Sequence, residues 1–122
     1  MAWCLRVIAA VCLLLVGVQS MRQFRGEIPN GYILRIPCQN ETWEGVGHMN
    51  FGGGGELNPF GRDFLAAGKK WTTNLCRLDS DGDGWTNGQE LGDPKCQWRV
   101  GRKLPKARSI THPGINNKDV KC

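Results

Sequence analysis

The stretch Asp79–Glu90, which reads DSDGDGWTNGQE, decides how the rest of this chain is interpreted. Aspartates stand at its first, third and fifth positions, a glycine at its sixth and a glutamate at its twelfth, as in an EF-hand calcium loop. Ca²⁺ takes about 6–8 oxygen ligands, so a short loop must curl around one point. The pattern predicts these ligands: Asp79, Asp81, Asp83, the Trp85 carbonyl, Asn87 and Glu90.

An ordinary polar turn is the main alternative, because Asp, Gly and Asn favour turns for reasons of their own. Three carboxylates at alternate positions would repel one another in such a turn, and a divalent cation would remove that cost. Mg²⁺ fits less well than Ca²⁺, since it prefers a rigid octahedron with several waters. The sequence therefore favours calcium.

A main helix is predicted before the loop, with Asn58 as N-cap, Pro59 at the first helical position and an end near Lys70. Its apolar stripe has spacings of four, three and four: Phe60, Phe64, Ala67 and Trp71. After the loop, Gly92-Asp93-Pro94 stops the chain from continuing as a helix. The exit helix should therefore span only about one turn.

Regular structure is expected to be sparse elsewhere. The run from Tyr32 to Ile36, between Pro29-Asn30-Gly31 and Pro37, predicts one short strand. Four consecutive glycines at 52–55 indicate loops. We predict a small α+β fold, a disulfide-stapled and loop-rich single domain with one main helix, a short strand or two, and an EF-hand-type calcium loop.

Residues Met1 to Ser20 have the pattern of a secretory signal peptide, with Arg6 followed by an apolar run of about 12 residues, too short to span a bilayer. The expected product is a secreted, extracellular domain of residues 21–122 without a membrane span. Four cysteines remain in it: Cys38, Cys76, Cys96 and Cys122. An even number in an oxidising compartment predicts two disulfides, and spacing leaves three pairings open. No two of them have the close spacing of zinc ligands.

Surface chemistry offers two further predictions. Asn40-Glu41-Thr42 is an N-glycosylation sequon. The segment from Lys95 to Arg108 holds six basic residues and no acid, in a chain of net charge +5. It is either a solvated surface or a patch for an acidic partner, such as a polyanionic glycan or an acidic protein. Nucleic acid is not expected, because no nucleic-acid-binding motif is present.

Catalysis is not expected either. The two histidines, His48 and His112, cannot supply the imidazoles of a copper centre, and neither lies in a nucleophile motif. We predict that both are surface or turn residues and that the protein is not an enzyme. No catalytic residue is assigned.

The chain contains a distinctive series of short motifs: Gly47-His48, Asn58-Pro59-Phe60-Gly61-Arg62-Asp63-Phe64, Trp71-Thr72-Thr73, Leu75-Cys76, the calcium loop, Leu91-Gly92-Asp93-Pro94 and Cys96. Together they resemble the temptins, a family of secreted water-borne pheromone proteins of gastropod molluscs. The likeness runs from about Phe24 to Cys122. It implies a pheromone-type role in mate attraction, with other secreted pheromone proteins or a receptor as partners. It also implies that Cys38 pairs with Cys76 and Cys96 with Cys122.

An extracellular matrix or shell-associated calcium protein is the alternative, because the loop and the secretion signal suit it equally well. Such a protein would usually carry a more acidic surface than this one, which has 16 Lys and Arg against 11 Asp and Glu. If the protein acts by binding partners, Trp98 beside Arg99 is the expected contact pair.

Overall fold

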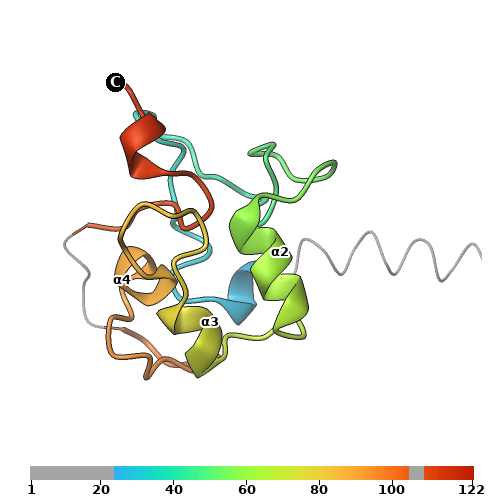
Figure 1. The fold of residues 1–122 in the computed structure, drawn as a ribbon, viewed down its shortest axis with the longest axis vertical. Coiled ribbons are helices and arrows are strands. Elements are labelled where there is room, and N and C mark those ends of the chain that lie inside the picture. Colours follow the sequence, from blue (N-terminus) through green and yellow to red (C-terminus); the bar gives the residue numbers. More distant parts are fainter. Residues whose placement is uncertain (1–23, 105–108) are drawn as a thin grey trace, which may run out of the picture.

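The computed structural model describes residues 24–104 and 109–122. It contains few helices, and their bounds are η1 Phe24–Glu27, α2 Pro59–Ala66, α3 Thr73–Arg77, α4 Asn87–Leu91 and η2 Asn117–Asp119 (Figure 1). The predicted signal peptide lies outside the described residues, as do Lys106 and Arg108 of the basic segment. Within the described part, no helix has the length and apolar character that crossing a membrane requires.

One hydrophobic cluster holds these short elements together. Its buried members are spread over residues 28–91: Ile28, Leu34, Val46, Phe60, Phe64, Leu75 and Leu91. Phe24, Ala67, Trp71 and Ile110 pack against it from the side. Because no element is long, most of the fold's order comes from this shared burial and from side-chain hydrogen bonds to loop backbone.

Helix α2 begins as predicted and ends early. The Asn58 side chain accepts a hydrogen bond from the Gly61 N–H at 2.9 Å, and Pro59 occupies the first turn. The expected end near Lys70 is wrong, because the helix stops at Ala66. Gly68 and Lys69 take left-handed backbone angles, with φ of 77° and 60°, which no right-handed helix contains. Trp71 therefore reaches the core from beyond the helix.

The predicted strand from Tyr32 to Ile36 reduces to an isolated bridge between Arg35 and Thr42. A second isolated bridge joins His48 and Leu57, and the described residues contain no longer ladder. The strand cannot extend backwards because the Ile33 N–H donates to the Asn30 carbonyl and closes a turn. It cannot extend forwards because Pro37 has no N–H to donate. The β part of the predicted α+β class was therefore an overestimate.

The two disulfides form, but with partners other than those the resemblance implied. Cys38 pairs with Cys122 and Cys76 with Cys96, at Cα–Cα distances of 5.6 and 5.7 Å. The implied pairs Cys38–Cys76 and Cys96–Cys122 are wrong. The chain folds back after α4, so that cysteines on either side of the acidic loop meet, while the C-terminus returns to the turn at Cys38.

Both histidines are buried, which corrects the expectation of surface or turn positions. His48 is 8 % exposed and His112 is 3 % exposed. The His112 ring stands edge-on to Trp43 with centroids 4.4 Å apart, and its Nδ1 accepts a hydrogen bond from the Gly114 N–H. Burial lowers the pKa of His112 to about 3, so that this imidazole is neutral in the folded protein.

Candidate metal site

Two one-turn helices present the acidic loop. Helix α3 is capped by Thr72, whose side chain accepts from the Leu75 N–H, and it ends at Arg77 just before the loop. Helix α4 starts with a capping box, in which Thr86 and Gln89 exchange side-chain and backbone hydrogen bonds. The two helices pack against each other. They fix both ends of the loop, so the positions of its carboxylates are defined.

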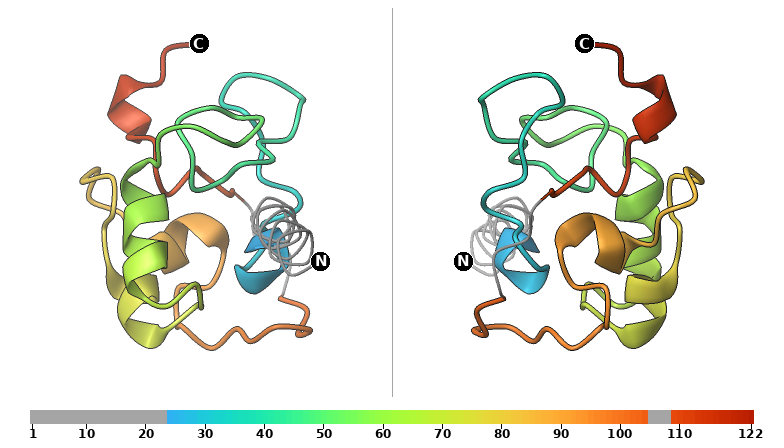
Figure 2. Two further views of the ribbon diagram at one scale, coloured as in Figure 1. Left: turned by 90° about the vertical axis from the view of Figure 1, so that its right-hand side faces the viewer. Right: turned by 90° about the vertical axis from the view of Figure 1, so that its left-hand side faces the viewer.

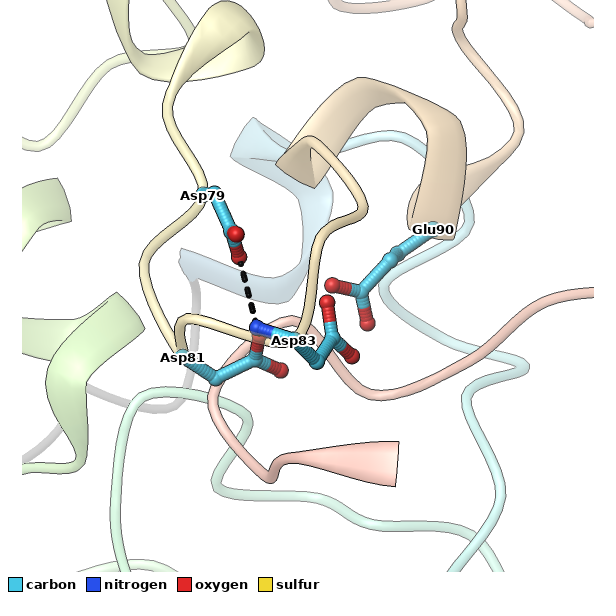
Figure 3. A group of neighbouring side chains, drawn as sticks. All are labelled: Asp79, Asp81, Asp83 and Glu90. Atoms are coloured by element: carbon cyan, nitrogen blue, oxygen red, sulfur yellow. Dashed lines mark hydrogen bonds between the residues drawn. The ribbon is translucent and has the colours of Figure 1, made fainter. Parts of the chain in front are cut away.

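Four carboxylates converge between the loop and α4 (Figure 3). Asp79, Asp81, Asp83 and Glu90 each offer one oxygen, and these oxygens all lie within 4.8 Å of one another. Glu90 comes from α4 and the three aspartates from the loop. Asp83 and Glu90 are buried, Asp81 is half-buried and Asp79 is exposed. The cluster is therefore reached from the Asp79 side.

Backbone N–H groups orient the aspartate side chains of the loop without any help from an ion. Asp79 accepts from the Gly84 N–H at 2.8 Å and from the Asp83 N–H at 3.2 Å. Asp83 in turn accepts from the Trp85 N–H at 3.0 Å. Gly84, with φ of 93°, supplies the sharp turn that the loop pattern predicted.

The cluster is electrostatically costly on its own. Burial raises the pKa of Glu90 to about 9, and repulsion from Asp81 adds to the shift. Burial likewise raises the pKa of Asp81 to about 7, with repulsion from Asp83 as the next cause. Burial also works to raise the pKa of Asp79, but the hydrogen bond from Gly84 opposes it and the net direction is downward. Nearby positive charge would offset these costs.

Two oxygens of the cluster are buried with no hydrogen-bond donor among the described residues: Asp81 Oδ2 and Glu90 Oε1. A buried carboxylate oxygen normally has a donor or a cation, because losing water without replacement costs free energy. The donor set contains oxygen only, with no histidine or cysteine. Oxygen-only sets suit hard cations such as Ca²⁺. The residues present therefore fit the predicted ion.

The remaining two predicted ligands are placed differently. Trp85 keeps its side chain at the surface, 56 % exposed, as expected of a residue that contributes only its carbonyl. Asn87 is fully buried, and its Nδ2 donates to the Leu75 carbonyl and to Ser80 Oγ. Its Oδ1 accepts from the Ser80 N–H at 3.4 Å. Asn87 thus ties the loop to α3 from inside.

The C-terminal segment covers the buried side of the cluster, which no motif had indicated. Thr111 Oγ1 donates to Glu90 Oε2 at 3.0 Å, and the Thr111 N–H donates to the Glu90 carbonyl. Asn116 Nδ2 donates to the Asp81 carbonyl at 3.3 Å, and the Asn117 N–H to Asp83 Oδ2 at 3.4 Å. These residues lie 21 to 35 positions from their partners. Local spacing could not have revealed them.

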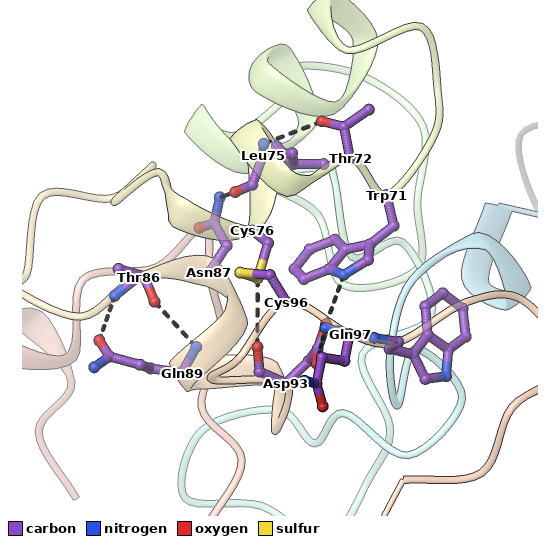
Figure 4. Close-up of a disulfide and its surroundings, with 11 residues drawn as sticks. Trp71, Thr72, Leu75, Cys76, Thr86, Asn87, Gln89, Asp93, Cys96 and Gln97 are labelled. Atoms are coloured by element: carbon purple, nitrogen blue, oxygen red, sulfur yellow. Dashed lines mark hydrogen bonds between the residues drawn. A yellow bond between two sulfur atoms is a disulfide. The ribbon is translucent and has the colours of Figure 1, made fainter.

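The Cys76–Cys96 disulfide braces the same region (Figure 4). Beside it, the buried Asp93 carboxylate accepts from Trp71 Nε1 and from the N–H groups of Gln97 and Trp98. A Cβ at Gly88 would lie 2.3 Å from Cys76 Sγ, so only glycine allows α4 to approach the disulfide this closely. Sequence analysis gave neither Asp93 nor Gly88 this role.

The other predicted surface sites are exposed. Asn40 of the sequon is accessible, and Lys95, Arg99, Arg102 and Lys103 of the basic segment are exposed too. Trp98 is half-buried, and its Nε1 donates to the Arg102 carbonyl at 2.8 Å. The expected contact pair is thus a Trp anchored to the segment's own backbone beside an exposed Arg99.

Comparisons with known proteins give a consistent result. A family model described as Temptin C-terminal matches residues 18–115. The chain is 50 % identical over 119 residues to the protein named temptin from Aplysia californica, and the match covers 97 % of this chain and 95 % of that protein. No solved structure matches. Since both matches extend over most of the chain, this protein belongs to the temptin family.

Proposed function

We propose that this protein is a secreted pheromone-type signal in mate attraction, which acts by binding other proteins and not by catalysis. The observation that carries the proposal is the match to Aplysia temptin along 97 % of the chain. A domain of this size with two disulfides suits release into water, because covalent links keep a small core folded.

Calcium is the proposed cofactor, held by Asp79, Asp81, Asp83 and Glu90 with the Trp85 carbonyl. The two carboxylate oxygens without donors and the oxygen-only ligand set support this choice. When bound, the ion would supply positive charge to a cluster that is costly without it. Its role is structural, since α4 spans only Asn87–Leu91 and is followed by Gly92 in a left-handed conformation. The paired long helices of an EF-hand sensor are therefore missing from this loop.

The basic segment is the proposed contact with an acidic partner protein. Arg99, Arg102 and Lys103 are exposed, and Trp98 adds an aromatic surface beside them. Arginine and tryptophan often contribute most of the binding energy in protein interfaces. Val100 of the same segment is also exposed and adds apolar surface to the contact.

A behavioural attraction assay tests the proposal, using recombinant protein with and without co-secreted attractant proteins. Wild type should raise attraction, and the triple change of Arg99, Arg102 and Lys103 to Ala should reduce it. The charge-matched control changes Lys70, Lys118 and Lys121 to Ala, all exposed and outside the basic segment, and should keep full activity. Wild type that never raises attraction in any mixture would overturn the pheromone role and favour the matrix alternative. Equal activity of the two triple variants would remove only the basic segment from the interface.

A further inference from the structure

A cavity of about 260 Å³ lies between η1, residues 44–48 and α2, apart from the acidic loop. Its apolar wall is formed mainly by Phe24, Ile28, Val46, Leu57, Phe60 and Phe64. No residue of Asp79–Glu90 lines it. Ligand pockets are typically apolar with a few placed polar groups, and this cavity has that composition.

His48 is the buried polar group in this wall. It is only 8 % exposed, and its Nδ1 has no hydrogen-bond partner among the described residues. Its backbone is held firmly, because its N–H donates to the Gly45 carbonyl and its carbonyl accepts from Asn58 Nδ2. Buried polar atoms in native proteins rarely lack a partner. That nitrogen is closed off from the cavity, so His48 contributes only its ring to the wall.

Charge at the cavity favours an anion. Lys69 lines it, with Nζ 5.3 Å from the Phe24 ring centroid. Arg25 also lines it, but its Nε donates to the Gly31 carbonyl and its guanidinium lies over the Tyr32 ring. Glu44 is the single acid among the lining residues. Lys69 is thus the cation best placed to pair with a ligand's carboxylate.

We propose that the cavity binds a small amphipathic carboxylate of the medium-chain fatty acid class. The apolar chain would lie among the phenylalanines, and the carboxylate would pair with Lys69. An apolar cavity of about 150 Å³ holds benzene, so 260 Å³ corresponds to about ten non-hydrogen atoms, the size of octanoate. This activity goes beyond the proposed signalling function and depends on neither calcium nor a protein partner.

The test is an NMR titration of the full secreted chain, labelled with ¹⁵N, with octanoate and, in parallel, with 1-octanol. Octanoate should cause saturable shifts at the amides of Val46, His48 and Phe64 and none in Asp79–Glu90. It should bind more tightly than the alcohol, which has the same chain and no charge. Absence of saturable shifts with octanoate, or shifts centred elsewhere, would overturn the proposal.

Two lysine variants test the position of the carboxylate. Lys69→Gln should weaken octanoate binding about threefold, as expected for an exposed ion pair, and leave 1-octanol binding unchanged. The matched control Lys70→Gln changes the neighbouring lysine, which does not line the cavity, and should have no effect. Equal effects of Lys69→Gln and Lys70→Gln would contradict the assigned carboxylate position.

Discussion

Two regions of this molecule hold their loop backbone in place with little regular structure, and they do so in different ways. The segment between η1 and α2 and the segment from α3 to Cys96 are both short of regular structure (Figures 1 and 2), and they meet where Asn30 Nδ2 donates to the Leu91 carbonyl at 2.8 Å. The first buries apolar side chains, such as Ile28, Leu34 and Val46. The second buries charged ones, including Asp83, Glu90 and Asp93.

Each region is nevertheless organised by one fully buried asparagine. Asn58 donates to the Val46 and His48 carbonyls and accepts from the Gly61 N–H. Asn87 donates to the Leu75 carbonyl and to Ser80 Oγ. Loop carbonyls that lack ladder partners need donors, and a buried amide can satisfy several at once. The difference lies in what surrounds the asparagine. Apolar neighbours bury without further partners, whereas the converging carboxylates lie among hydrogen-bond donors and beside a disulfide, and they are the proposed site of a cation.

Removing each disulfide should give the largest effects. Chain entropy predicts a loss of about 4.5 kcal/mol for Cys38→Ala with Cys122→Ala, and about 3 kcal/mol for Cys76→Ala with Cys96→Ala, since the bridges span 84 and 20 positions. The second pair should weaken calcium binding more, because its bridge lies beside the loop, whereas the first bridge reaches the cluster only through the C-terminal segment. Denaturant unfolding with and without Ca²⁺ measures both effects. Peptide mapping without reduction should recover Cys76 linked to Cys96, and a Cys38–Cys76 peptide would contradict the fold.

Replacing the two asparagines tests whether each one organises its own region. Asn58→Ala and Asn87→Ala should each lower the free energy of unfolding by about 3 kcal/mol, because each leaves buried backbone groups without partners. Calcium affinity should fall in Asn87→Ala and stay unchanged in Asn58→Ala. Calorimetric titration with Ca²⁺ distinguishes them. Equal losses of affinity would mean that the two regions are not independent.

Calcium should stabilise the wild type by about 2.7 kcal/mol at a hundredfold excess over the dissociation constant, by mass action on the folded state. Glu90→Gln should abolish this gain. In chelator the same variant should be at least as stable as wild type, because it no longer buries the carboxylate whose pKa burial raises to about 9. Thermal melting in Ca²⁺ and in chelator measures this. If the melting temperature of the wild type is the same in Ca²⁺ and in chelator, calcium is not a ligand of this protein.

Replacing two glycines by alanine should distinguish a tightly packed position from an open one. Gly88→Ala places Cβ 2.3 Å from Cys76 Sγ and 2.5 Å from the Asp93 carbonyl oxygen, so the backbone must move. We expect a loss of about 2 kcal/mol, typical of overpacking. The control Gly52→Ala meets nothing closer than 3.6 Å and should change stability by less than about 0.5 kcal/mol. Urea unfolding of the two variants is sufficient.

The smallest predicted effect is a pH dependence from His112. Its folded-state pKa of about 3 lies below its unfolded value of about 6.5, so the unfolded chain binds more protons between these limits. The stability of the folded state is therefore complete above pH 6.5 and falls as the pH drops towards 3. Between pH 6.5 and 5.5 the loss should be about 1 kcal/mol.

His112→Asn tests this because asparagine can still accept from the Gly114 N–H but does not titrate. The variant should be less stable throughout, and its melting temperature should vary less with pH across that window than the wild type's. Other titrating groups are common to both chains and cancel in the difference. Identical slopes would show that folding does not lower the pKa of His112.

Features confined to a dozen neighbouring residues were readable from the sequence. The N-cap at Asn58 and the one-turn helix Asn87–Leu91 followed from propensities and turn chemistry, and the structure confirms them. The spacing of Asp79, Asp81, Asp83 and Glu90 predicted that their carboxylates would meet, and they lie within reach of one ion. In each case the chain's own geometry fixes the arrangement, so little depends on distant residues.

Only the tertiary structure decided which distant parts meet. The pairing of Cys76 with Cys96, the cover of Glu90 by Thr111 and the burial of His48 and His112 each join or enclose residues that no local pattern connects. The strand expected at Tyr32 to Ile36 failed for the same reason, since a ladder needs a partner and the chain offers only Thr42 for one bridge. The entropy cost of bringing two distant residues together changes little with the length of chain between them. The packing of the whole core therefore decides which distant residues meet. Spacing in the sequence therefore does not choose among the alternatives.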